Sequence, residues 1–221
     1  MDRTYPTRRA ERALDAGLDY ARQVAGGDLA AHPWTRAAAH RFEHDIAEAE
    51  AGGRWVFDRD RALRPIAFAA EMLKVEGARM IFTPWQSWIT AAIFGFVDGE
   101  RGIRRIRQAV ILADDRAAHV ALVAALALSA VFCEGGKSGE AFASPVVFDA
   151  ARRMIEASKG FRESWKVRAE AELIQQGGTG GTTASLRWIA GDGVAFDLIG
   201  ADVGKLAIEI VEPEGRFFVG T

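Results

Sequence analysis

The chain contains a single cysteine, Cys133, which excludes an intramolecular disulfide framework. Its longest apolar run, Val120 to Phe132, is too short for a bilayer span, which needs about 20 residues. The first residues include no apolar segment that could serve as a signal peptide. The net charge of -2 argues against a protein that coats nucleic acid, although a local basic patch is compatible with it. We therefore expect a cytoplasmic protein that does not enter a membrane.

Motifs for common chemistries are also lacking. The sequence shows no Ser/His/Asp nucleophile pattern and no Cys/His metal cluster. His40 and His44 lie at i, i+4, a spacing that suits a metal ion, but no third ligand motif accompanies them. We interpret this segment as a polar helix face and expect no metal.

The first hundred residues instead have the apolar spacing and composition of helices. Residues that favour helix ends bound each of them. The first expected helix ends at Gly26-Gly27, and the second runs from an N-cap at Thr35 to Gly52-Gly53. The third runs from a cap at Asp58 or Asp60 to Met72, with Pro65 near its first turn. The fourth begins at Thr83-Pro84.

From Arg101 onward the pattern changes to alternating strands and helices. Strands are expected in "QAVIL", "ASLRWIAG", "KLAIEIVE" and "RFFVGT", a buried helix over residues 117–132, and an amphipathic helix in "VFDAARRMIEAS". The sequence thus predicts an α/β fold. Residues 1–100 form a helical region and residues 101–221 an α/β core, packed together as one compact unit.

Two constellations have residue types that suit nucleotide or phosphate binding. In "FTPWQSWITAAIFGF", a buried aromatic helix accounts for Trp85, whereas the Gln86 amide offers the donor and acceptor that reading an adenine edge requires. Four arginines follow in "RGIRRIR", and they fit either a solvated turn or contact with phosphate or nucleic acid. These arginines are Arg101, Arg104, Arg105 and Arg107.

The stretch from Gln108 to Phe132 has the strand–loop–helix layout of a phosphate-binding loop, but its loop reads "ADDRAAH" and lacks Gly-Lys-Ser. That string does occur later, in "CEGGKSGE" around Lys137 and Ser138. The segment upstream reads as the end of a helix rather than as a strand. We therefore interpret "CEGGKSGE" as a glycine-rich turn.

Three stretches read in order resemble the large terminase subunit of tailed bacteriophages. They are "HRFEHDIAEAEAGGRWVFDRDRALRPIAFAAEMLKVEG", "FTPWQSWITAAIFGF" and "IRRIRQAVIL", and the later "VFDAARRMIEAS" also fits. The resemblance runs from His40 to Ile155, with a fainter continuation to Glu212. It implies a P-loop-NTPase-like sheet of the ASCE type, the class to which packaging ATPases belong. By this resemblance, Gln86 would contact the adenine of a bound nucleotide, with Trp85 beside it. ATP and Mg²⁺ would be the cofactors. The partners would be terminase subunits, portal or DNA.

The chain departs from this family where the chemistry occurs. Alanines stand where glycine and lysine belong, Asp114 and Asp115 add negative charge, and Arg116 is the cation left in the loop. The acidic strand of the family would correspond to "KLAIEIVEPEG", but Ile210 follows Glu209 where a catalytic glutamate belongs. With a shifted register Glu212 would serve instead. We expect no nuclease domain with its acidic cluster to follow.

The resemblance therefore predicts a protein of phage or prophage origin that is related to DNA packaging. We expect weak or no ATP hydrolysis and action by binding DNA or packaging partners. One alternative is an active nucleotide hydrolase whose non-standard phosphate loop includes Lys137 and Ser138. Another is a regulatory or inhibitory module that uses the scaffold for protein contacts.

Overall fold

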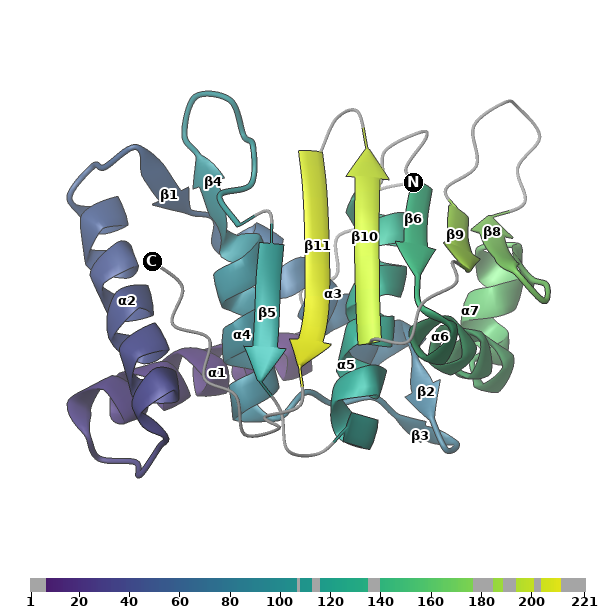
Figure 1. Cartoon of the computed structure of the whole chain (residues 1–221), viewed down its shortest axis with the longest axis horizontal. Helices are drawn as coiled ribbons and strands as arrows, with labels where there is room; N and C mark the ends of the chain where they lie inside the picture. The colour runs from purple at the N-terminus through teal and green to yellow at the C-terminus, as the bar shows by residue number, and fades with distance from the viewer. Residues whose placement is uncertain are drawn as a thin grey trace.

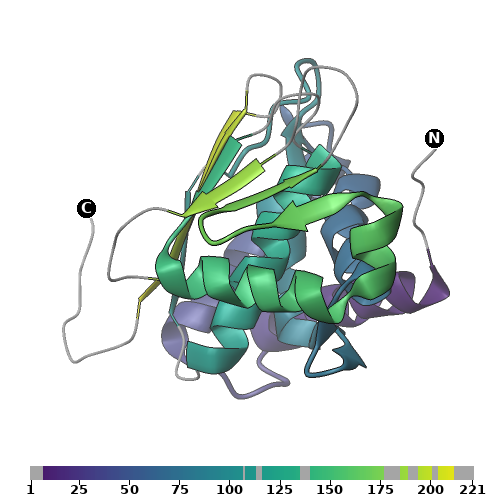
Figure 2. The same cartoon turned by 90° about the vertical axis from the view of Figure 1, so that its right-hand side faces the viewer.

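The computed structural model describes residues 7–106, 108–112, 116–134, 140–176, 185–188, 194–200 and 204–211. It has a mixed α/β fold in which helices α4 and α5 lie behind the strands of the largest sheet (Figure 1). Turned by 90°, the strands of this sheet form one layer and helices form the other (Figure 2). No helix in these ranges is long and apolar enough to cross a membrane.

Four helices dominate the first hundred residues, as the sequence predicted. They are α1 (Arg8–Gly26), α2 (Pro33–Glu50), α3 (Arg59–Met72) and α4 (Pro84–Gly95). The expected stop after α1 is confirmed, because Gly27 takes the left-handed conformation with φ of 84°. The expected caps at Asp58 and Thr83 are also confirmed, since each side chain accepts a backbone N–H of the first turn.

Two details of these helices differ from the expectation. Thr35 is not an N-cap: α2 begins at Pro33, and the His32 ring nitrogen Nδ1 accepts the Trp34 N–H at 3.3 Å. Proline suits the first helical position because its missing N–H would have no partner there. Pro65 lies in the second turn of α3 rather than the first.

Helix α1 crosses α4 at unusually close range. A Cβ atom added to Gly17 would lie 2.6 Å from the backbone nitrogen of Trp88 and 2.8 Å from the Ser87 Cβ. Only glycine allows this approach, and the contact fixes α4 against α1.

The largest sheet has seven strands in the order β5-β11-β10-β6-β9-β8-β7. Its members are β5 (Gln108–Leu112), β6 (Glu140–Ala143), β7 (Val167–Ala169), β8 (Leu173–Gln176), β9 (Ser185–Trp188), β10 (Val194–Gly200) and β11 (Gly204–Val211). The pairs β5–β11 and β6–β9 are parallel, and the others are antiparallel. The strands expected in "QAVIL", "ASLRWIAG" and "KLAIEIVE" are confirmed, and "RFFVGT" lies outside the described residues.

Two short ladders complete the strands. One pairs β1 (Trp55–Phe57) with β4 (Phe96–Asp98), and the other pairs β2 (Lys74–Val75) with β3 (Ala78–Arg79). The first ladder closes a cluster of aromatic rings in which Phe42 meets Phe57 and Phe96 edge to face.

The remaining helices are α5 (Arg116–Ser129), α6 (Pro145–Ala157) and α7 (Lys159–Ser164), with a π-helical turn at Ala130–Glu134. The expected helix over residues 117–132 is thus an α-helix that ends in a π-turn. Leu122 and Leu126 of α5 are fully buried, and Phe68 of α3 packs edge to face on Phe161 of α7 at 5.3 Å. One apolar core therefore joins residues of the helical region and of the α/β region.

Candidate functional site

The first turn of α4 contains Trp85 and Gln86, the two residues singled out for nucleotide binding. Thr83 Oγ1 accepts the Gln86 N–H at 3.3 Å, and Gln86 Oε1 accepts the Thr83 N–H at 3.0 Å. These two bonds form a capping box, which satisfies the free donors at a helix start. The glutamine thus has a structural role, and an adenine that needed its amide oxygen would compete with the cap.

Trp85 brings the first turn of α4 next to the first turn of α5. Its ring meets the His119 ring edge to face, with centroids 5.0 Å apart. Arg116 is the first residue of α5, so the helix starts beside the tryptophan. The amino ends of two helices therefore lie together, and such ends favour negative charge.

Strands β5 and β11 end next to each other. They pair in parallel, with Val110 opposite Glu209 and Leu112 opposite Val211. Because parallel strands run in the same direction, their carboxyl ends meet at one edge of the sheet, which we call the carboxyl edge. Ligands of open α/β sheets bind outside such ends. Glu209 lies two residues before the end of β11, and Glu212 lies outside the described residues.

A groove of about 390 Å³ runs between α2, α4 and β5. Trp34, Phe42, Trp85 and Trp88 line it, and Gln108 of β5 adds a polar side chain. Trp34 is 51% exposed, although large apolar side chains are usually covered. Sequence reasoning did not identify Trp34, even though the pair Pro33-Trp34 at a helix start was a usable signal. Flat aromatic walls of this kind suit a planar ring as a ligand.

The arginines of "RGIRRIR" mostly face the protein. Arg104 is buried, with 3% of its surface exposed, and its guanidinium lies 4.8 Å from the centroid of the Phe94 ring. Burial, together with the nearby charge of Arg61, lowers the pKa of Arg104 to about 10, so it stays protonated at neutral pH. Of the three arginines that the structure describes, Arg101 alone is exposed, and Arg107 lies outside the described residues.

Arg105 is held by Asp45 of α2. Its Nη2 donates to Asp45 Oδ1 at 3.0 Å, and its Nη1 lies 2.9 Å from Oδ2. The guanidinium also packs over the rings of Trp55 and Phe96. Arg104 and Arg105 thus tie the segment after β4 to the helices, and they do not form one cationic surface with Arg101.

The turn after β4 is organised by the carboxylate of Asp98. It accepts the backbone N–H groups of Glu100 and Arg101, and Arg54 Nε donates to it at 3.0 Å. The bond from the Arg101 N–H and then the Arg54 guanidinium lower the pKa of Asp98 below its ordinary value. The backbone of Arg101 is therefore held in this turn by its hydrogen bond to Asp98.

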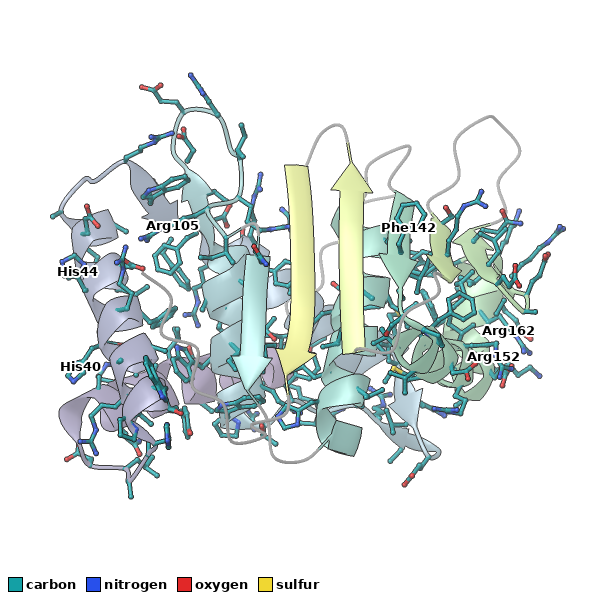
Figure 3. All side chains as sticks on the ribbon, viewed as in Figure 1. His40, His44, Arg105, Phe142, Arg152 and Arg162 are labelled. Atoms are coloured by element: carbon teal, nitrogen blue, oxygen red, sulfur yellow. The ribbon has the colours of Figure 1, made fainter. Side chains whose placement is uncertain are left out.

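Polar side chains on α2 include the two histidines of the sequence pattern (Figure 3). Donor atoms of His44, Asp45 and Glu48 lie within 4.8 Å of one another. Asp45, however, already accepts Arg41 Nε at 2.8 Å besides its pair with Arg105. Two guanidinium groups balance this carboxylate, so the interpretation as a polar helix face is kept.

Lys137 and Ser138 lie outside the described residues. The described chain resumes at Glu140, which begins β6 and pairs with Ile199 of β10. Ile199 in turn pairs with Lys205, near the start of β11. Glu140 therefore lies at the edge of the sheet opposite the carboxyl edge.

Comparison of the whole chain with known protein families, with curated proteins and with solved structures finds no match.

Proposed function

We propose that this chain is a terminase large-subunit-like protein of phage or prophage origin that acts in DNA packaging by binding, with weak or no ATP hydrolysis. The parallel pairing of β5 with β11 is the observation that supports it. The resemblance assigns the phosphate loop to the end of the first strand and the acidic residues to the second. The two strands lie side by side, and α5 follows β5 in the strand–loop–helix order of a P-loop.

The residues at the carboxyl edge do not fit a magnesium–triphosphate complex. A phosphate loop needs backbone N–H groups freed by glycine, a lysine for the phosphates and a hydroxyl for magnesium. The sequence has alanines there, and Asp114 and Asp115 would repel phosphate. Glu209 is followed by Ile210, where the family has its catalytic glutamate. The aromatic side chains that line the groove beside Trp85 are compatible with a planar base as a ligand.

The hydrolase alternative depends on Lys137 and Ser138. Both residues lie outside the described part of the chain. The absence of glycine and lysine from "ADDRAAH" after β5 favours binding over hydrolysis. A purely regulatory protein contact differs from our proposal in needing neither nucleotide nor DNA.

Two measurements on the purified protein test the proposal. Phosphate release from ATP, with and without duplex DNA, is expected to stay at the level of buffer. Turnover that disappears in Lys137→Ala would support the hydrolase instead. A fluorescent ATP analogue is then titrated against the wild type, Gln86→Glu and Gln86→Ala.

The two Gln86 variants separate adenine contact from helix capping. Glutamate can replace glutamine in a capping box, so Gln86→Glu keeps the helix start but removes the amide donor. If the base contacts Gln86, both variants weaken binding. If only Gln86→Ala does, the residue acts through the cap. If the wild type binds neither the nucleotide nor DNA, the packaging proposal is contradicted.

A further inference from the structure

A second concavity, of about 430 Å³, lies where the amino end of α1 meets α3 and β3. Four arginines line it together with Thr7 and one carboxylate, that of Glu71. The arginines are Arg8, Arg9, Arg12 and Arg79. It shares no lining residue with the aromatic groove.

Helix geometry explains why the arginines of α1 gather on one side. Arg8 and Arg12 are four residues apart and Arg9 and Arg12 three, which places neighbours on one face of a helix. Thr7 caps this helix by accepting the Ala10 N–H at 3.3 Å. All three arginines are exposed, and in the part of the chain that the structure describes no ion pair engages them.

The single carboxylate of the concavity is already neutralised. Arg79 Nη1 lies 3.0 Å from Glu71 Oε2, and the Glu71 side chain is 23% exposed. Asp15 of α1 pairs with Arg59, and Glu11 is the acidic residue in the first turn of α1. The guanidinium groups of Arg8, Arg9 and Arg12 therefore outnumber the acidic side chain of Glu11, and the local charge attracts an anion.

We propose that this concavity holds the phosphate backbone of duplex DNA. Guanidinium groups bind phosphate oxygens through paired N–H donors, and three of them in one turn and a half of helix match successive phosphates. Because the net charge of the chain is -2, DNA binding would depend on a local cationic surface, and this concavity is one. The inference rests on the proposed packaging function, because it names the surface that would contact the packaged DNA.

Salt-dependent DNA binding tests the proposal. Anisotropy of a fluorescein-labelled 20-base-pair duplex is measured between 50 and 200 mM NaCl with the full chain. Three phosphate contacts give a slope of log K against log salt of about -2.7, which weakens binding roughly 40-fold over this range. Replacing Arg8, Arg9 and Arg12 together by glutamine is expected to lower affinity at 50 mM salt at least tenfold and to remove most of the slope. Glutamine has nearly the same helix propensity as arginine, so α1 is kept.

The matched control removes three exposed arginines that do not line the concavity. Arg153→Gln, Arg162→Gln and Arg168→Gln together change the net charge equally, and Arg162 lies on α7 at the β7–β8 end of the molecule (Figure 3). The control is expected to stay within about twofold of the wild type at 50 mM salt. An equal loss in both triple variants, or no binding by the wild type, would overturn the proposal.

Two further readouts separate this site from others. Competition by pyrophosphate at constant ionic strength would, if it displaced the duplex at micromolar concentration, assign the concavity to small polyphosphates and overturn the DNA assignment. The ATP analogue is titrated against the α1 triple variant, which is expected to bind it like the wild type. If the wild type binds the ATP analogue but not the duplex, this DNA surface is refuted while the proposed scaffold function stands.

Discussion

Replacing Gly17 by alanine tests the packing that positions α4. Helix propensity alone predicts that this change stabilises the protein by about 0.5–1 kcal/mol, because glycine is a poor helix former. The crossing with α4 predicts the opposite sign. The new Cβ would lie 2.6 Å from the Trp88 nitrogen and 2.9 Å from the Ser87 carbonyl carbon, which are backbone atoms that cannot rotate away.

The size of the effect follows from the distances. The backbones of α1 and α4 must separate until the 2.6 Å contact reaches ordinary van der Waals distance, which begins at 3.4 Å. Overpacking of this kind costs about 1–3 kcal/mol, and the gain in helix propensity offsets part of it. We expect a net loss of about 1–2 kcal/mol, or roughly 2–8 °C in Tm for a chain of this size.

The free energy of unfolding is measured by urea denaturation with tryptophan fluorescence, to which Trp85 and Trp88 contribute. Gly160→Ala in α7 is the control, because no atom lies within 4 Å of the added Cβ. It is expected to leave stability unchanged or to raise it by a few tenths of a kcal/mol. A Gly17→Ala protein as stable as the wild type would refute the close crossing.

Three further predictions concern polar contacts. Thr83→Ala and Gln86→Ala are each expected to lower the free energy of unfolding by about 0.5–1 kcal/mol, whereas Gln86→Glu should change it little; equal losses in all three would argue against the capping box. Asp45→Ala leaves the mostly buried guanidinium of Arg105 without its carboxylate, and urea denaturation should show a loss of about 2 kcal/mol, with no change arguing that the pair contributes nothing. Because the folded pKa of Asp98 lies below its unfolded value near 3.8, the ionised carboxylate stabilises the fold above that pH, and the contribution is lost as pH falls through the folded pKa. Unfolding at pH 5 and pH 3 should therefore show a smaller pH dependence in Asp98→Asn than in the wild type, and an unchanged dependence would contradict this role.

Local signals in the sequence were sufficient for most helix ends. The glycine pair after α1 and the Thr-Pro pair before α4 act through their own backbone preferences, and both ends are where they were expected. The start of α2 was misplaced because Thr35 is a strong cap by type, but Pro33 two residues earlier already favours the first helical turn.

Contacts between distant segments were beyond the sequence. Strand β10 was not singled out, since Asp197 interrupts its apolar pattern, and its partner β6 comes from a distant part of the chain. The same holds for the candidate site. The pattern placed Trp85 and Gln86 at a helix start, but only the folded chain brings the Trp85 ring to His119.

The pairing of β5 with β11 also has a consequence for synthesis on the ribosome. Val211 joins Leu112 about 100 residues after Leu112 has been made, so this contact raises the contact order of the fold. At 5–20 residues per second, β5 waits about 5–20 s for its partner strand. The helices of the first hundred residues meet one another much sooner. Translation therefore gives the helical region time to assemble while β5 remains an open strand edge, the interval in which a chaperone would protect the nascent chain most.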